Sequence, residues 1–257
     1  MSEFCKVERD GPVTTITITR PEVMNAIHPP ASAALSAAFD AFVADPDAWV
    51  AILTGAGDKA FSAGNDLKFQ AGGGKIESPA SGFGGITSRF DNPKPVIAAV
   101  NGLALGGGFE LVLACDLAIA SERASFGLPE PRVGLAALAG GLHRLPRQIG
   151  LKPALGMLLT GRRVDAREAL ALGIVNEVVA PGDLMGAARR WADQICECSP
   201  VSVRTSKRVA LEGLAHASLE QAMSARYDAI VDLVKSADFV EGPRAFAEKR
   251  KPRWTGN

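Results

Sequence analysis

Strand-like and helix-like segments alternate along the first half of the chain. Residues 13–19 alternate with period two and are rich in β-branched side chains, which is typical of a half-buried strand. Apolar residues at helical spacing follow at 31–43, and an apolar run follows at 49–54. The order recurs, with a strand, a helix and a strand predicted at 95–100, 109–114 and 117–120. This alternation predicts an α/β fold.

Two other stretches depart from this alternation. Residues 70–92 hold seven of the chain's glycines and prolines and few large apolar residues, so we predict a long loop, which in a compact domain is usually functional or disordered. Three helical stretches without intervening strands are predicted toward the C-terminus, at 184–196, 201–214 and 218–236. The C-terminal third is therefore expected to be helical.

Composition and charge narrow the class of protein. The 257 residues are 47% hydrophobic and 22% charged, which is ordinary globular usage. The 28 basic residues balance the 28 acidic ones, so nucleic acid is disfavoured as the main partner. The start of the chain has no signal-peptide pattern, and no apolar run reaches about 18 residues. We expect a soluble cytoplasmic protein, not membrane-bound, with four structural cysteines and no metal site.

A glycine-rich segment, residues 101–110, joins a predicted buried strand to a predicted helix. Its consecutive glycines Gly106, Gly107 and Gly108 let the backbone approach a ligand, and unpaired amides at a helix start attract negative charge. The segment predicts an anion or oxyanion site. It fits neither G-x-G-x-x-G, because Leu111 takes the last position, nor a phosphate-binding P-loop. The alternative is that the glycines only permit close helix packing.

A second junction of small residues lies at 60–68, after the predicted strand that ends near Thr54. Its exposed amides could supply a second donor. A pair of backbone donors is what enolate chemistry at a thioester carbonyl requires. Taken alone, however, the segment also fits an ordinary turn.

Two carboxylates stand close to these segments in the sequence. Glu110 lies in the first turn of the predicted helix on an apolar stretch, where a carboxylate either has a task or stabilises the helix dipole. Glu130 lies between Pro129 and Pro131. Two carboxylates near one oxyanion hole suit the addition of water, with one as base and the other as acid. No G-x-S-x-G elbow supplies a nucleophile for hydrolysis.

Five segments together resemble the enoyl-CoA hydratase/isomerase (crotonase) family, over about residues 16–254; they are 61–64, 94–102, 104–108, 115–116 and 126–130. The resemblance implies an α/β spiral of ββα repeats in residues 1–198. It also implies a helical region, 199–257, that packs against neighbouring subunits in trimers or dimers of trimers. The implied activity is that of an enoyl-CoA hydratase, a hydro-lyase acting on acyl-CoA thioesters as in fatty acid metabolism, without a cofactor.

The resemblance also implies roles for individual residues. The amides of Asn65 and Gly107 would hold the enolate oxygen. Glu130 would exchange the proton at the α-carbon, and Glu110 would activate or release water at the β-carbon. The CoA substrate would lie along residues of four segments, namely Ala26, Ala63, Asp66, Leu67, Lys68, Gly106 and, near the nucleotide, Lys249, which could belong to a neighbouring subunit.

Within the family the chain is most similar to carnitinyl-CoA dehydratases, through residues 61–68, 107–111 and 241–250. That subgroup usually has Trp where Asn65 stands, so the carnitine substrate is not carried over. Leu142 and His143 replace a Thr-Gln pair that is usual in hydratases, and we interpret His143 as a structural residue at a helix start. The alternatives are a dehydratase of the carnitinyl type, a double-bond isomerase or, from another class, a non-catalytic RNA-binding or assembly protein.

Overall fold

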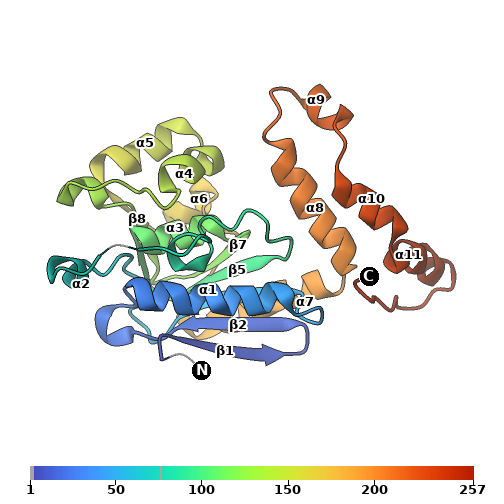
Figure 1. The fold of residues 1–257 in the computed structure, drawn as a ribbon, viewed down its shortest axis with the longest axis horizontal. Coiled ribbons are helices and arrows are strands. Elements are labelled where there is room, and N and C mark those ends of the chain that lie inside the picture. The colour runs from blue at the N-terminus through green and yellow to red at the C-terminus, as the bar shows by residue number, and fades with distance from the viewer. Residues whose placement is uncertain (1–2, 76) are drawn as a thin grey trace.

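The computed structural model describes residues 3–75 and 77–257, and Figure 1 shows its course. Predictions that involve Met1, Ser2 or Ile76 lie outside the described residues. A six-stranded sheet runs through the core in the order β1-β2-β3-β5-β7-β10. The β1–β2 pair is antiparallel and the other pairs are parallel. Its strands are β1 (Cys5–Asp10), β2 (Val13–Ile18), β3 (Val50–Gly55), β5 (Val96–Val100), β7 (Leu117–Ser121) and β10 (Glu177–Val179).

A second sheet of four short strands has the order β4-β6-β8-β9. Along the chain, a strand of the large sheet is followed by one of the small sheet and then by a helix or helical turn. The first such repeat is β3, β4 and α2, and the next is β5, β6 and α3. The expected ββα spiral is therefore confirmed. The bounds are β4 (Ala60–Ser62), β6 (Leu103–Leu105), β8 (Ser125–Gly127), β9 (Arg163–Asp165), α2 (Leu67–Ala71) and α3 (Gly107–Ala114).

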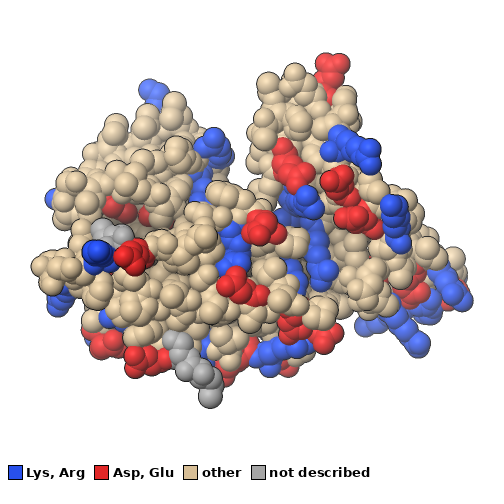
Figure 2. Space-filling model, viewed as in Figure 1, with Lys and Arg blue, Asp and Glu red and all other residues tan. Residues whose placement is uncertain are grey.

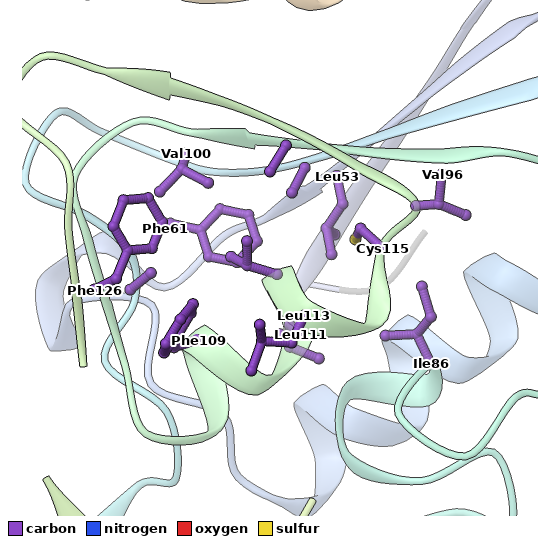
Figure 3. Close-up of a cluster of buried hydrophobic side chains, with 14 of the residues drawn as sticks. Leu53, Phe61, Ile86, Val96, Val100, Phe109, Leu111, Leu113, Cys115 and Phe126 are labelled. Atoms are coloured by element: carbon purple, nitrogen blue, oxygen red, sulfur yellow. The ribbon is translucent and has the colours of Figure 1, made fainter. Parts of the chain in front are cut away.

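Both faces of the large sheet are covered. Alternate residues of β5 point to opposite sides, so this strand shows what covers each face. Val96, Ala98 and Val100 join the larger core cluster beneath α1 (Pro29–Ala44) and α3, part of which is drawn in Figure 3. Ile97 and Ala99 join a second cluster with apolar residues of α7 (Leu184–Cys196). Burial on both sides explains why this strand reads as a continuous apolar run.

Most predicted elements of the core are present with small shifts in their ends. The helix predicted at 31–43 begins earlier, because Pro29 and Pro30 occupy its first turn, where a missing N–H costs nothing. Residues 70–92 form a loop, apart from the end of α2 and a helical turn, η2 (Phe83–Gly85), among the described residues. Two further helical turns are η1 (Pro21–Val23) and η4 (Pro181–Asp183), and a third, η3 (Glu130–Val133), includes Glu130.

Three further helices of the core are α4 (Gly141–Ile149), α5 (Leu151–Thr160) and α6 (Ala166–Leu172), of which only a helix start near His143 was predicted. The α4 and α5 pair packs above α3, on the side of the molecule that also carries α2 (Figure 1). Pro146 inside α4 and Gly150 directly after it obscure the helical pattern in the sequence.

The C-terminal arm consists of α8 (Pro200–Gly213), α9 (Leu219–Ser224), α10 (Asp228–Lys235) and α11 (Ala237–Ala247) and extends beside the core (Figure 1). The single helix predicted at 218–236 is wrong. The chain breaks between α9 and α10 with Ala225 in extended backbone, and the hydroxyl of buried Tyr227 donates to the carbonyl of Ala222 at 2.7 Å. Burial of Tyr227 therefore outweighs local helix propensity.

Charged side chains of both signs gather where the arm meets the core (Figure 2). Lys207 of α8 donates to the carbonyl of Lys94 at 2.8 Å and to the carboxylate of Asp116 at 2.7 Å. The same Asp116 oxygen accepts the amide of Val96 at the start of β5. One acidic side chain thus ties the arm to the central sheet.

Candidate active site

The two small-residue junctions of the sequence lie against each other in the fold. A Cβ atom placed on Gly64 would stand 2.8 Å from the amide nitrogen of Gly107 and 2.6 Å from the carbonyl oxygen of Leu105. Gly64 also has a φ of +87°, which side chains other than glycine rarely adopt. The absence of a side chain therefore lets the 60–68 segment pack against the start of α3.

The amides of Asn65 and Gly107 take no part in the hydrogen bonds of the bridge and helix to which they belong. Ile27 and Asn65 form a parallel bridge, in which the amide of Ile27 donates to Gly64 and the amide of Asp66 donates to Ile27. In this pattern the amide of Asn65 points away from its partner strand. Gly107 is the first residue of α3, so its amide has no acceptor within the helix.

Glu110 lies in the first turn of α3 and is buried, with 3% of its surface exposed. Its Oε1 accepts the amide of Gly141, the first residue of α4, at 2.8 Å. Burial raises the pKa of the Glu110 carboxyl to about 7; the amides of Gly141 and Ala139 and the charge of Arg144 oppose the rise, and Glu130 adds to it. A carboxyl with this pKa can both take and give a proton near neutral pH.

Glu130 reaches the same region from η3. Its Oε1 would lie 3.0 Å from a Cβ atom on Gly106, so the missing side chain of Gly106 makes room for the carboxylate. Burial also raises the pKa of Glu130. Its Oε2 is buried without a hydrogen-bond partner among the described residues, and an orphaned polar atom of this kind calls for an explanation.

The structure thus brings four of the predicted residues to one place. Asn65 and Gly107 present amides along the packed junctions, and Glu110 and Glu130 approach the start of α3 from α3 itself and from η3. The charge of Glu130 adds to the rise in the pKa of Glu110, so the two carboxyls are close enough to influence each other. Two carboxyls placed in this way can divide the roles of acid and base between them.

A narrow pocket of about 10 Å³ adjoins this site, with room for about one water molecule. Asn65, Gln70, His28 and Phe83 line it. The side-chain amide of Asn65 donates to Gln70 at 2.9 Å, and the Phe83 ring lies 2.6 Å from where a Cβ atom of Gly107 would stand. The pocket is therefore continuous with the wall formed by the two amides.

Apart from Gly106, which adjoins the Glu130 carboxylate, the predicted CoA-binding residues fall into three groups. Ala26, Ala63 and Asp66 support the fold around Asn65: Asp66 caps α2 through the amide of Phe69 and pairs with Arg20 at 3.0 Å, which lowers the pKa of Asp66 despite its burial. Leu67 and Lys68 are exposed on α2. Lys249 follows α11, and Figure 1 places α11 at the opposite end of the molecule from α2. One chain does not bring Lys249 to this groove.

Sequence reasoning missed two residues that bear on Glu110. Gly141 supplies the amide that binds its carboxylate, and Arg144, one turn later in α4, contributes a positive charge. The Gly140-Gly141 pair before Arg144 was the available signal. His143 is exposed in the first turn of α4, at the helix start where it was predicted.

The part of the chain that the structure describes holds neither a candidate metal centre nor a membrane-spanning helix. No group of three or more His, Cys, Asp or Glu side chains in residues 3–75 and 77–257 could hold a metal ion. Within the same ranges no helix is long and apolar enough to cross a membrane.

Comparisons with known proteins identify relatives of the chain. The chain is 45% identical over 271 residues to carnitinyl-CoA dehydratase of Salmonella arizonae, with all of both chains covered. Its structure is similar to that of enoyl-CoA hydratase from Mycobacterium tuberculosis, with a TM-score of 0.93, 39% identity and all of both chains covered. It is also similar to enoyl-CoA hydratase from Bacillus anthracis, with a TM-score of 0.90, 36% identity, and 99% of this chain and 100% of that chain covered. A model of the enoyl-CoA hydratase/isomerase family matches residues 8–257, and the chain belongs to this family.

Proposed function

We propose that the protein is an enoyl-CoA hydratase, which adds water reversibly to the double bond of a 2-enoyl-CoA thioester. The observation that carries the proposal is the pair of carboxyls at the start of α3, where Glu110 is buried and Glu130 is half-buried with a buried, unpaired Oε2. Burial raises the pKa of both carboxyls, so both hold a proton more readily than ordinary carboxyls do. Family membership and hydro-lyase relatives support the same reaction class.

The proposed reaction needs only proton transfers and charge stabilisation. Ionised Glu110 takes a proton from water as its oxygen bonds to the β-carbon, and the π electrons move to the thioester oxygen. The amides of Asn65 and Gly107 hold this oxyanion. Protonated Glu130 then gives its proton to the α-carbon, and the product is a 3-hydroxyacyl-CoA. Both proton transfers use side chains, so the proposed reaction requires no cofactor.

The proposed CoA groove runs along Ala26, Ala63 and the exposed face of α2, with Gly106 beneath the reacting carbons. Leu67 and Lys68 would contact the nucleotide half, where the lysine suits a phosphate. Because Lys249 lies far from the groove of its own chain, it would contribute to the groove of a neighbouring subunit.

We also propose a trimer or dimer of trimers that acts in the cytoplasm. Large apolar side chains of the arm are exposed in one chain, including Leu214 at 80% and Met223 at 79%. Contiguous exposed apolar surface marks an interaction site. The four cysteines are free thiols, as is usual in a reducing compartment.

A second candidate is the dehydration of a carnitinyl-type 3-hydroxyacyl-CoA, favoured by the 45% identity to carnitinyl-CoA dehydratase. The same two carboxyls would run the reaction in reverse. Turnover of crotonyl-CoA and of carnitinyl-CoA by the same preparation separates the two candidates. A rate with carnitinyl-CoA well above that with crotonyl-CoA would favour the second.

The test of the proposed function compares three variants in the hydration of crotonyl-CoA. Glu110→Gln and Glu130→Gln should each lower kcat by about 10²–10⁴-fold, because each removes one proton-transfer group. Glu122→Gln, which changes an exposed carboxylate that follows β7, is the matched control and should keep the parent rate. A parent protein without hydration activity, or a Glu130→Gln variant at the parent rate, would contradict the proposal.

A further inference from the structure

The turn that holds Glu110 belongs to α4, and Arg144 closes it. Gly140 has a φ of +108° and precedes the residue whose amide binds Glu110. The amide of Arg144 donates to the carbonyl of Gly140 at 2.8 Å, so the first turn of α4 begins at this glycine. Any change in the position of this turn moves the hydrogen bond from Gly141 to Glu110.

The guanidinium group of Arg144 folds back over the same turn. Its Nη1 lies 2.1 Å from where a Cβ atom of Gly140 would stand, so the missing side chain of Gly140 gives it space. Its Nη2 donates to the carbonyl of Thr87 at 2.8 Å, and its Cζ lies 5.5 Å from the centre of the Phe90 ring. Arg144 therefore joins the α4 turn to the long loop that follows α2.

The charge of Arg144 also faces Glu110. The charged and titratable groups around this carboxyl are Glu130 from η3 and Arg144 from α4, while Cys115 at the end of α3 faces Arg144. Burial lowers the pKa of Arg144, and the negative charge of Glu110 opposes this. No ion pair within 4.0 Å joins Arg144 to Glu110 among the described residues, so the influence acts through space and through the turn.

We propose that Arg144 is a positioning residue for Glu110: it fixes the Gly140–Gly141 turn against the loop at Thr87 and keeps a positive charge beside the carboxylate. The inference rests on the proposed function, in which Glu110 is the acid–base group at the β-carbon. It assigns the 87–90 part of the long loop a role in setting the state of Glu110. A movement of this loop would then change the hydrogen bond and the charge at Glu110 through the side chain of Arg144.

Arg147 offers a matched control in the same helix. It lies one turn later, is exposed, and donates to the carbonyl of His143 at 2.8 Å. Arg147→Gln therefore removes the same charge from α4 without touching the Gly140 turn or Thr87. Arg144→Lys keeps the charge beside Glu110 but loses the planar group that reaches Thr87 while lying against Phe90.

The first measurement follows the protonation of Glu110 by infrared difference titration without substrate, with Glu110→Gln identifying its carboxyl band. Arg144→Gln should shift the midpoint to higher pH than in the parent, because the ionised carboxylate loses a neighbouring positive charge. Arg144→Lys and Arg147→Gln should keep the parent midpoint. An Arg144→Gln midpoint equal to that of Arg147→Gln would overturn the proposal.

The second measurement is kcat for crotonyl-CoA against pH. Arg144→Lys should lower kcat by about tenfold or more, with little change in KM and an unshifted pH profile, because the carboxylate is displaced while its charge environment is kept. If Arg144→Gln does not fold, Arg144→Lys still decides the matter, and a parent-like kcat would overturn the positioning role. A parent without hydration activity would refute the proposed function, while the infrared titration would still test Arg144.

Discussion

At the residue scale, Glu110 is a buried carboxyl group, and its neighbours offset part of the cost of burying its charge. The Gly141 amide at the start of α4 binds its Oε1, and Arg144 supplies a positive charge nearby. Glu130 has fewer partners, because its Oε2 is buried and unpaired. We interpret this difference as a difference in role: protein groups hold Glu110 in place, whereas Glu130 keeps an oxygen free for the substrate.

The raised pKa of Glu110 predicts a pH-dependent cost to stability. Its pKa is about 7 in the folded protein against 4.5 ordinarily, so the folded state holds more protons between these values. The stabilisation is therefore full below pH 4.5 and is lost as the pH rises through 7. The unfolding free energy of Glu110→Gln minus that of the parent should be larger at pH 8 than at pH 4.5 by about 1–3 kcal/mol, measured by urea unfolding.

The control for this prediction is Glu122→Gln, which changes an exposed carboxylate. Its unfolding free energy should differ from that of the parent by the same amount at both pH values. If the unfolding free energies of Glu110→Gln and the parent differ by the same amount at pH 4.5 and pH 8, the ionised carboxylate does not destabilise the fold and the prediction is contradicted.

The site residues were predictable in part. Glu110 stands out as a carboxylate on an apolar helix, and Gly106–Gly108 stand out as glycines at a helix start. Glu130 carries no local signal of its function, and only the resemblance paired it with Glu110. The Gly140-Gly141 pair indicates a turn, but it does not indicate that the Gly141 amide binds Glu110, because that contact depends on how α4 packs on α3.

At the element scale, the start of α3 packs against β4 so closely that side chains are excluded. A Cβ atom on Gly108 would lie 2.1 Å from the carbonyl oxygen of Ser62, and backbone cannot yield as a flexible side chain can. The helix start and the β4 strand therefore position each other. This contact keeps Gly107 beside the Gly64–Asn65 segment.

Gly108→Ala should push α3 away from β4 and lower the unfolding free energy by about 1–3 kcal/mol, as overpacking typically does. It should also lower kcat, because the Gly107 amide moves. Gly156→Ala in α5 is the matched control: a Cβ atom there meets nothing within 4 Å, and the change should stabilise by about 0.4–1 kcal/mol. Urea unfolding of both variants, with equal effects in the two, would refute this packing argument.

Elements with strong local patterns were predictable, and those set by tertiary packing were not. β2, β5 and α7 follow from period-two, apolar and helical patterns. The short strands of the small sheet have three residues each, too few to show a period. The break between α9 and α10 depends on where Tyr227 is buried.

At the scale of the whole molecule, the core has an extensive buried interior and the arm has little. The core buries both faces of its large sheet, whereas the arm leaves many apolar side chains in solvent; among them are Leu211, Leu214, Leu219, Met223, Val240 and Phe246. The Lys207–Asp116 pair is one of the contacts that hold the arm to the core. The remaining surface of the arm suits the proposed contact with other subunits.

Leu214→Glu should weaken the proposed oligomer, because it places a charge in an apolar interface. Light scattering coupled to gel filtration should show a trimer or hexamer for the parent and a smaller species for the variant. Val7→Glu, which changes an exposed apolar residue of β1, should leave the mass unchanged. A parent that elutes as a monomer would contradict the proposed assembly.

The central claim is that Glu110 and Glu130 together add water across a CoA-conjugated double bond. Crotonyl-CoA should be incubated with the protein in oxygen-18-labelled water and the product analysed by mass spectrometry. The account predicts one labelled oxygen at the β-carbon of a 3-hydroxyacyl-CoA, with the rate of labelling strongly reduced in Glu110→Gln and in Glu130→Gln. A product with a shifted double bond and no label, or labelling at the parent rate in either variant, would contradict it.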